Sequence, residues 1–452
     1  MKSLFSFFLL LTLTVFGLSA PLSGTYTINS ALPTGGTNFT SFNSAEDSLT
    51  LNGVSGPVIF LVKQGTYAEQ VSFGNITGAS ASNTITFRAD PTNTAIAKIE
   101  FNTATSSNNY VIQFNSASHF IIDSLIVSSS SSTYGTLINF EGNSTFIELR
   151  NNNFVGSLSG GSSTNLALIN KGSGTTKTIN NLVVKNNDFL GGSYGVYIYG
   201  NSQGRMAHFE ISNNTILKPV TGFINFEYCA DVLVENNYCE DDSARTGNFK
   251  GFYATRADSA VHFRKNNIVI NSTSGYIYGI SVSYLFGSAS HYTTIENNMI
   301  AMPLASVGGQ YGIKVQNCIY QNIYHNSVKV NHTGTYSYAL DMSGIGTSTY
   351  GKTNIVNNIF FNGQANYAFK FNNYSAPGYI DSLDHNIYYS TGSNPFRFHS
   401  TDYANLSLFQ TATGLNANSL FGDPGFTSSK DLHLVGTLAD NAGNNTLGIT
   451  ID

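Results

Sequence analysis

Only 10% of the 452 residues are charged and the formal net charge is −5, so the chain lacks the basic surface that a nucleic-acid partner requires. Trp is absent, but 32 Phe and 26 Tyr supply large side chains for a core, so the low charge does not indicate disorder. The length exceeds the usual size of one globular domain, a limit that a repeating fold escapes by adding repeats.

The first 19 residues resemble a secretory signal peptide. Lys2 precedes an apolar run from Leu4 to Phe16, and Gly17-Leu18-Ser19 offers a small-x-small cleavage site. The run is too short to span a bilayer, and no later stretch approaches the ~18 apolar residues that a span requires. We therefore expect an exported protein without a membrane span, either secreted or on the cell surface.

Residues 20–57 are expected to form an N-terminal lead-in and cap segment. Phe42, Ala45 and Leu49 share one helical face, and Gly53 follows as a stop signal. A short amphipathic helix there would cover the open end of the first coil, whose strand edges otherwise invite aggregation. Beyond it the pattern predicts strands at 58–62, 70–73, 84–87 and 98–101, with a turn at 65–67.

The rest of the chain repeats one pattern, an apolar strand that runs into a polar pair, usually Asn-Asn, and then another apolar pair. The second residue of that pair is Asn at positions 152, 187, 214, 237, 266, 298, 326, 358 and 386. The mean spacing of about 29 residues is typical of a solenoid. Asn tolerates a left-handed backbone at a sharp corner, and stacked Asn side chains can bond along the stack.

We therefore predict an all-β fold, a right-handed parallel β-helix over residues 58–435, with three short strands per coil and an Asn ladder. Residues 436–452 would form a C-terminal tail. Because the chain ends like a module rather than a polar cap, we expect further C-terminal modules in a longer protein.

Three cysteines are an odd number for an exported protein. Cys229 and Cys318 each lie eight residues before the ladder Asn of their coil, so they should share a column. They are three coils apart, roughly 14 Å at the usual strand spacing, which is too far for a disulfide. Buried free thiols are the preferred interpretation, and a Cys229–Cys239 disulfide is the alternative.

Several segments together resemble a known class. These are Gly56-Pro-Val-Ile-Phe60, Gly65-Thr-Tyr67-Ala-Glu69, the Asn-Asn coils, Gly422-Asp-Pro-Gly-Phe426 and Asp431-Leu-His-Leu434. They resemble secreted bacterial right-handed parallel β-helix repeat proteins, similar to the pectate-lyase-like superfamily. The resemblance implies the fold, but that superfamily includes lyases, hydrolases, esterases and non-catalytic adhesins, so it leaves the activity open.

The strand before each Asn corner can be aligned between coils. Alternation predicts two outward columns, the first comprising Tyr197, Asn225, Ala254, Ser281, Lys314, Asp341, Lys370 and Arg397, and the second Tyr199, Glu227, Arg256, Ser283, Gln316, Ser343, Asn372 and His399. We interpret a third set, Tyr194, Tyr278, Tyr311, Tyr338 and Tyr367, as a corner stack belonging to the core.

In the resembled superfamily the corresponding sheet often forms the saccharide groove. The candidate binding residues are therefore Tyr197, Tyr199, Lys314, Asp341, Lys370 and Arg397. A lyase needs a cation near the sugar carboxylate and a base near the proton that it removes, so the catalytic candidates are Lys370, Arg397 and His399. The alternative is a surface charge ladder without function.

No zinc spacing, nucleophile elbow or phosphate loop is apparent, so we expect no metal site and no cofactor; Ca²⁺ is left open, although no carboxylate loop supports it. The first functional hypothesis is an exported module that binds polysaccharide or a cell-surface glycan, or serves as an adhesive scaffold. The alternative is a lyase or glycoside hydrolase acting on an acidic polysaccharide.

Overall fold

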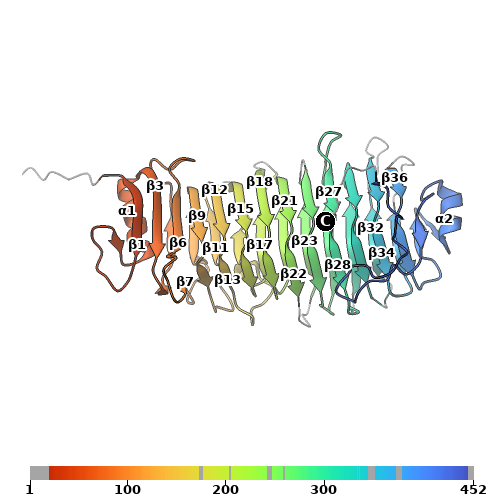
Figure 1. Ribbon diagram of the computed structural model, residues 1–452, viewed down its shortest axis with the longest axis horizontal. Helices are drawn as coiled ribbons and strands as arrows, with labels where there is room; N and C mark the ends of the chain where they lie inside the picture. The colour runs from red at the N-terminus through yellow and green to blue at the C-terminus, as the bar shows by residue number, and fades with distance from the viewer. Residues whose placement is uncertain are drawn as a thin grey trace, which may run out of the picture.

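The computed structural model describes residues 20–172, 177–202, 205–241, 247–257, 260–306, 308–332, 334, 336–344, 352–372 and 379–445. The expected signal peptide (1–19) and residues 446–452 of the expected tail lie outside the described residues. Figure 1 shows an elongated molecule in which the strands follow one another along the long axis in chain order, from α1 (Phe42–Asn52) at one end to α2 (Leu406–Thr413) at the other.

Three sheets run the length of the molecule, and from β3 (Val54–Val62) to β38 (Phe396–Phe398) each successive strand of the chain enters the next sheet in turn. Sheet A contains β2 (Asn38–Phe39), β1 (Leu22–Ile28), β3 (Val54–Val62), β6 (Ile85–Ala89), β9 (Ser118–Asp123), β12 (Asn143–Arg150), β15 (Thr178–Lys185), β18 (Met206–Ser212), β21 (Cys229–Glu235), β24 (Val261–Arg264), β27 (Thr293–Glu296), β30 (Gln321–Tyr324), β33 (Thr353–Val356) and β36 (Ile380–Asp384).

Sheet B follows each Asn corner. It contains β4 (Gly65–Ala68), β7 (Ala97–Glu100), β10 (Ile126–Ser128), β13 (Asn153–Val155), β16 (Asp188–Leu190), β19 (Thr215–Leu217), β22 (Tyr238–Asp241), β25 (Asn267–Ile270), β28 (Met299–Met302), β31 (Ser327–Val330), β34 (Ile359–Asn362), β37 (Ile387–Ser390) and β40 (Leu420–Phe421).

Sheet C completes each coil. It contains β5 (Val71–Phe73), β8 (Ile112–Asn115), β11 (Ile138–Glu141), β14 (Ile169–Lys171), β17 (Tyr194–Tyr199), β20 (Gly222–Glu227), β23 (Phe249–Thr255), β26 (Tyr276–Ser283), β29 (Gly309–Gln316), β32 (Ser337–Ser343), β35 (Tyr367–Asn372), β38 (Phe396–Phe398) and β39 (Thr401–Tyr403). Strand pairs are parallel except for β38 with β39. The predicted right-handed parallel β-helix is confirmed.

A helix lies at each end of the stack (Figure 1). At the N-terminal end, α1 (Phe42–Asn52) begins at the capping residue Ser41 and buries Phe42, Ala45 and Leu49, as predicted. At the other end, α2 (Leu406–Thr413) buries Phe409 against the aromatic rings of the last coil. A short 3₁₀ helix (Thr164–Leu166) interrupts one loop.

The Asn ladder is continuous through all nine predicted positions. In eight of them the side-chain Oδ1 accepts hydrogen bonds from the backbone N–H and the Nδ2 of the ladder Asn in the preceding coil, at 2.8–3.1 Å. The first, Asn152, accepts from the backbone N–H of Leu125 at 3.0 Å. Each of these nine side chains is at most 2% exposed. The residue before each ladder Asn is the one in the left-handed region, for example Asn236 at φ 55°.

The interior is one continuous hydrophobic cluster that runs through the coils. Cys229, Cys239 and Cys318 are free and fully buried in it, which confirms the predicted thiols and excludes the disulfide alternative. Lys171 is a buried cation beside this cluster: its side chain faces inward at the level of Ile198 of the next coil.

The C-terminal segment returns along the outer face of sheet B. Leu432 is 1% exposed and packs with Val269 and Ala301, whose strands lie several coils earlier. An ion pair between Lys430 and Glu240 (Nζ–Oε1, 2.9 Å) fixes the same segment to β22.

Two expectations from the sequence are wrong. Residues 65–67 are not a turn: they belong to β4, where buried Tyr67 donates a hydrogen bond to the carbonyl of Ile28 at 2.9 Å. In β23 the alternation is shifted by one residue, because Asn225 pairs with Tyr253 and not with Ala254. Ala254 is therefore interior, and Arg256 lies beyond the strand, since a one-residue slip exchanges the two faces.

Candidate functional site

The predicted line of outward residues exists on sheet C, with Tyr253 in place of Ala254. Successive strand pairings join Tyr197, Asn225, Tyr253, Ser281, Lys314, Asp341, Lys370 and Arg397. Parallel strands lie about 4.8 Å apart, so the line is a linear array of side chains along the molecule.

Two of the cations in this line are tied to carboxylates. Lys370 Nζ lies 3.0 Å from Asp341 Oδ1, and the two side chains are 15% and 4% exposed. Arg397 Nε lies 2.8 Å from Asp402 Oδ1, which β39 supplies. Lys314 has no carboxylate within ion-pair distance among the described residues, and burial lowers its pKa.

A row of tyrosines lies beside this line of outward residues. Each of the three cations in the line lies over the ring of one of these tyrosines. Lys314 Nζ is 4.6 Å from the ring centroid of Tyr311, and Lys370 Nζ is 4.2 Å from that of Tyr338. Arg397 Cζ lies 5.4 Å from the ring centroid of Tyr367. We call the four rings and three cations (Tyr278, Tyr311, Tyr338, Tyr367, Lys314, Lys370 and Arg397) the tyrosine–cation strip.

The rings of the strip stack on one another, with centroids 4.9–5.8 Å apart. The predicted stack therefore exists for four of its five members, because Tyr194 contacts Tyr197 instead. Tyr311 and Tyr338 are buried, at 7% and 5% exposed, beneath Lys314 and Lys370, although the stack lies outside the main hydrophobic cluster. Tyr276 and Tyr336 extend the aromatic surface and are 37% and 45% exposed.

The remaining predicted site residues lie outside the strip. Tyr197 contacts Tyr194 (centroids 5.1 Å apart), and burial raises its pKa to about 12. Tyr199 contacts Tyr228. His399 follows the end of β38 at φ 55°, and its ring contacts Phe398 and Phe371 at centroid distances of 4.5 and 5.5 Å.

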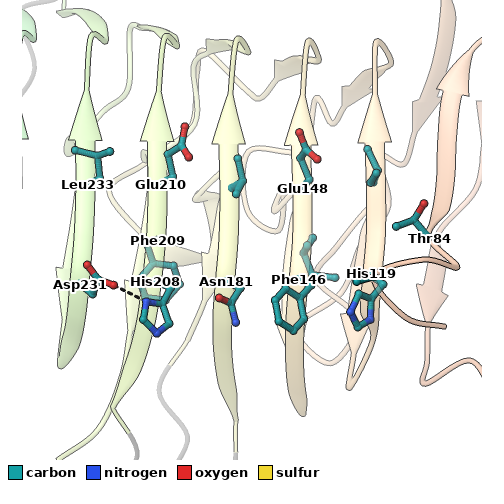
Figure 2. Close-up of a pocket in the computed structure, with 14 residues that line it drawn as sticks. Thr84, His119, Phe146, Glu148, Asn181, His208, Phe209, Glu210, Asp231 and Leu233 are labelled. Atoms are coloured by element: carbon teal, nitrogen blue, oxygen red, sulfur yellow. Dashed lines mark hydrogen bonds and ion pairs between the residues drawn. The ribbon is translucent and has the colours of Figure 1, made fainter.

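A groove on the outer face of sheet A was not predicted from the sequence. Its floor is formed by β9, β12, β15, β18 and β21, and its volume is about 520 Å³. Figure 2 shows one row with His119, Phe146, Asn181, His208 and Asp231 at the same level of successive strands. All five adopt a left-handed backbone, with φ between 51° and 64°.

A second row of the groove carries charge. Glu148 and Glu210 lie on β12 and β18, in register with Val183 between them. Figure 2 shows both carboxylates on the same side of the sheet. Glu148 is paired with Lys185 (Nζ–Oε1, 2.8 Å) and Arg150 (Nη1–Oε1, 3.3 Å), whereas Glu210 accepts a hydrogen bond from the Ser212 hydroxyl at 2.7 Å.

The histidines differ in their surroundings. The His119 ring stacks on Phe146, with centroids 4.8 Å apart and planes 17° apart, and burial lowers its pKa, so the imidazole is neutral near pH 7. His208 Nδ1 hydrogen bonds to the Asp231 carboxylate. The row that runs from His119 to Asp231 is therefore aromatic at one end and polar at the other.

The sequence did contain a signal for this groove. Phe146, Asn181, His208 and Asp231 each lie six residues before the ladder Asn of their coil, and His119 lies six before Leu125, which holds the ladder position in its coil. The five residues differ in type, so neither composition nor alternation marks them.

Comparison with known families decides the classification. The family described as "Periplasmic copper-binding protein (NosD)" matches residues 159–387, which is 229 of the 452 residues. The chain belongs to the NosD family. No curated protein matches it in sequence. Among its described residues, no helix is long and apolar enough to cross a membrane.

Solved structures similar to this NosD-family chain share little sequence with it. A GH136 lacto-N-biosidase from Eubacterium ramulus is 9% identical, over 88% of this chain and 67% of its own, with a TM-score of 0.41. A mannuronic-acid-specific family 6 polysaccharide lyase from the human gut microbiota is 12% identical, over 89% and 92%, with a TM-score of 0.31. Pectin methylesterase PemA from Erwinia chrysanthemi is 9% identical, over 74% and 93%, at 0.22.

Copper, which the family description implies, does not fit the described residues. No three His, Cys, Asp or Glu side chains come together there as a metal-binding group. The three thiols are fully buried, and burial raises the pKa of Cys318 to about 12. His119 and His208 are three strands apart in sheet A, roughly 14 Å at the usual spacing.

Proposed function

We propose that this NosD-family β-helix is exported by its N-terminal signal peptide and binds an acidic polysaccharide on the outer face of sheet C without cleaving it. The observation that carries the proposal is the tyrosine–cation strip: a Lys or Arg sits over a tyrosine ring in three consecutive coils. Cations attract sugar carboxylates, and the exposed rings of Tyr276 and Tyr336 beside the strip can stack on sugar rings.

The strip has the dimensions of a polymer site. Its members repeat at the strand spacing of about 4.8 Å, which is close to the length of one sugar unit in an extended polysaccharide. Lys314 would be the main anion contact, because Asp341 and Asp402 already hold Lys370 and Arg397. Those carboxylates fix the two cations in place, so Lys370 and Arg397 would position the polymer more than attract it.

Binding is favoured over a lyase reaction by the position of the candidate base. A base must reach the sugar proton at hydrogen-bonding distance. His399 lies past the end of β38, with its ring against Phe398 and Phe371. The proposal therefore assigns Lys314 and Arg397 to binding, gives buried Tyr311 the role of supporting Lys314, and assigns no catalytic role to His399.

The test is an oligosaccharide array that includes oligogalacturonate and oligomannuronate, read for binding and for new unsaturated chain ends. Losing one charge-assisted contact costs about 1.5–3 kcal/mol of binding free energy. Lys314→Gln should therefore weaken binding roughly ten- to a hundredfold at low salt. Lys265→Gln, an exposed lysine at an Asn corner, is the matched control. The proposal fails if no acidic glycan binds, if both variants lose equal affinity, or if unsaturated product accumulates.

A further inference from the structure

The sheet A groove differs from the tyrosine–cation strip in the sign of its charge. Among the described residues that line it there are three carboxylates, Glu148, Glu210 and Asp231, and no Lys or Arg. Arg150 and Lys185 pair with Glu148, and His208 pairs with Asp231. Glu210 contacts no cation within the described part of the chain, so it is the carboxylate that remains without a counter-charge.

Phe146 is the hydrophobic contact point of the groove. Its side chain is 50% exposed although its ring stacks on His119. A bulky residue with φ 54° is uncommon, since an L-residue in the left-handed region costs roughly 1–2 kcal/mol. This conformation turns the ring outward, so its free face lies at the groove surface, as Figure 2 shows.

The Glu210 carboxylate and the exposed Phe146 ring together favour a ligand that carries both a positive charge and an apolar face. Phe146 and Glu210 lie on β12 and β18, two strand steps apart, which is roughly 10 Å. An apolar sugar face on Phe146 would therefore belong to a different sugar unit from a group that contacts Glu210. A groove of about 520 Å³ has room for an oligosaccharide segment.

We propose that the sheet A groove is a second glycan site, selective for a segment that carries free amino groups. The C–H face of one sugar stacks on Phe146 and His119, and the ammonium group of a neighbouring sugar pairs with Glu210. Asn181, between them on β15, lies within reach of the sugar hydroxyls. With an anionic polymer on sheet C and a cationic one on sheet A, the protein would join two polymers of opposite charge.

The experiment is calorimetric titration of the purified protein with the glucosamine hexasaccharide and, separately, with its fully N-acetylated form. The free-amine hexasaccharide should bind, and acetylation should weaken binding at least roughly tenfold, because it removes the charge that Glu210 neutralises. Phe146→Ala should also lose roughly tenfold or more. Glu210→Gln should abolish the preference for the free amine.

Matched controls separate the groove from general effects. Phe286→Ala removes an aromatic ring of similar exposure (47%), and Glu296→Gln removes an outward carboxylate of sheet A outside the groove; both should bind like the parent. Lys314→Gln should leave the binding of the hexasaccharide unchanged. The result of this titration is therefore independent of the proposal for sheet C. Equal binding of both hexasaccharides, no binding, equal loss in the controls, or preference for a lysine-rich peptide over the sugar would overturn the proposal.

Discussion

Replacing Asn237 by Ala in the middle of the ladder should lower the free energy of unfolding by about 2–6 kcal/mol. Four hydrogen bonds are lost: Asn214 N–H and Nδ2 to Asn237 Oδ1 (both 3.0 Å), and Asn237 Nδ2 to the Ile211 carbonyl and to Asn266 Oδ1 (both 2.9 Å). Asn214 Nδ2 keeps the Val184 carbonyl, and Asn266 Oδ1 keeps the backbone N–H of residue 237.

The cost therefore comes mainly from two buried backbone groups, the N–H of Asn214 and the carbonyl of Ile211. An orphaned buried group costs about 1–3 kcal/mol, and the two together give the expected range. Urea denaturation followed by circular dichroism measures the change, and hydrogen exchange of the peptide that contains Asn214 localises it.

Asn236→Gly is the matched control for this prediction. Asn236 is the exposed neighbour of Asn237 at φ 55°, a conformation that Gly adopts without steric cost. Its unfolding free energy should change by less than about 1 kcal/mol. Equal midpoints for Asn237→Ala and the parent would refute the view that the ladder amides satisfy buried backbone groups.

Three further predictions concern the interior. Cys229, Cys239 and Cys318 should all react with a thiol reagent after denaturation without reduction and none before it; fewer than three titratable thiols would show a disulfide. Burial lowers the pKa of Lys171 to about 8, below its ordinary 10.5, so the folded state loses the proton first and stability should rise with pH above about 8. The free energy of unfolding should increase by about 2 kcal/mol by about pH 9.5, and Lys171→Met should remove this increase. If the variant and the parent gave parallel stability profiles against pH, Lys171 would not be its source. Gly312→Ala should lower the free energy of unfolding by about 1–3 kcal/mol, because the added Cβ would lie 2.6 Å from the Ala339 carbonyl oxygen. An unchanged denaturation midpoint would contradict this close packing.

The fold was predictable because one chemical requirement recurs in every coil. Each corner needs a left-handed residue followed by a side chain that can both donate to and accept from the neighbouring coils, and Asn meets the second need in nine coils. The first residue is Asn in six coils and Lys265, His325 or His385 in the other three, which shows that the ladder constrains only the second position.

The sequence predictions failed where the residue type does not show whether a side chain faces the interior or the solvent. In β23, Phe252 and Tyr253 are both large and aromatic, so alternation alone could not decide which one faces inward. The sheet A groove was missed because its backbone bend sets the direction of the side chains, and residues as different as His119 and Phe146 accept that bend. The ion pairs of Lys370 and Arg397 depend on partners in other strands, which spacing along one strand does not reveal.

The polysaccharide proposal is tested most directly by tyrosine fluorescence, since the chain has no Trp to mask the emission of its 26 Tyr. Titration with an acidic oligosaccharide should change the emission saturably, because sugar rings would cover Tyr276 and Tyr336 beside the strip. In the Lys314→Gln/Arg397→Gln double variant, the titration midpoint should shift to at least roughly tenfold higher concentration. An emission that does not respond to any acidic oligosaccharide, or that responds identically in the double variant, would contradict binding at the strip.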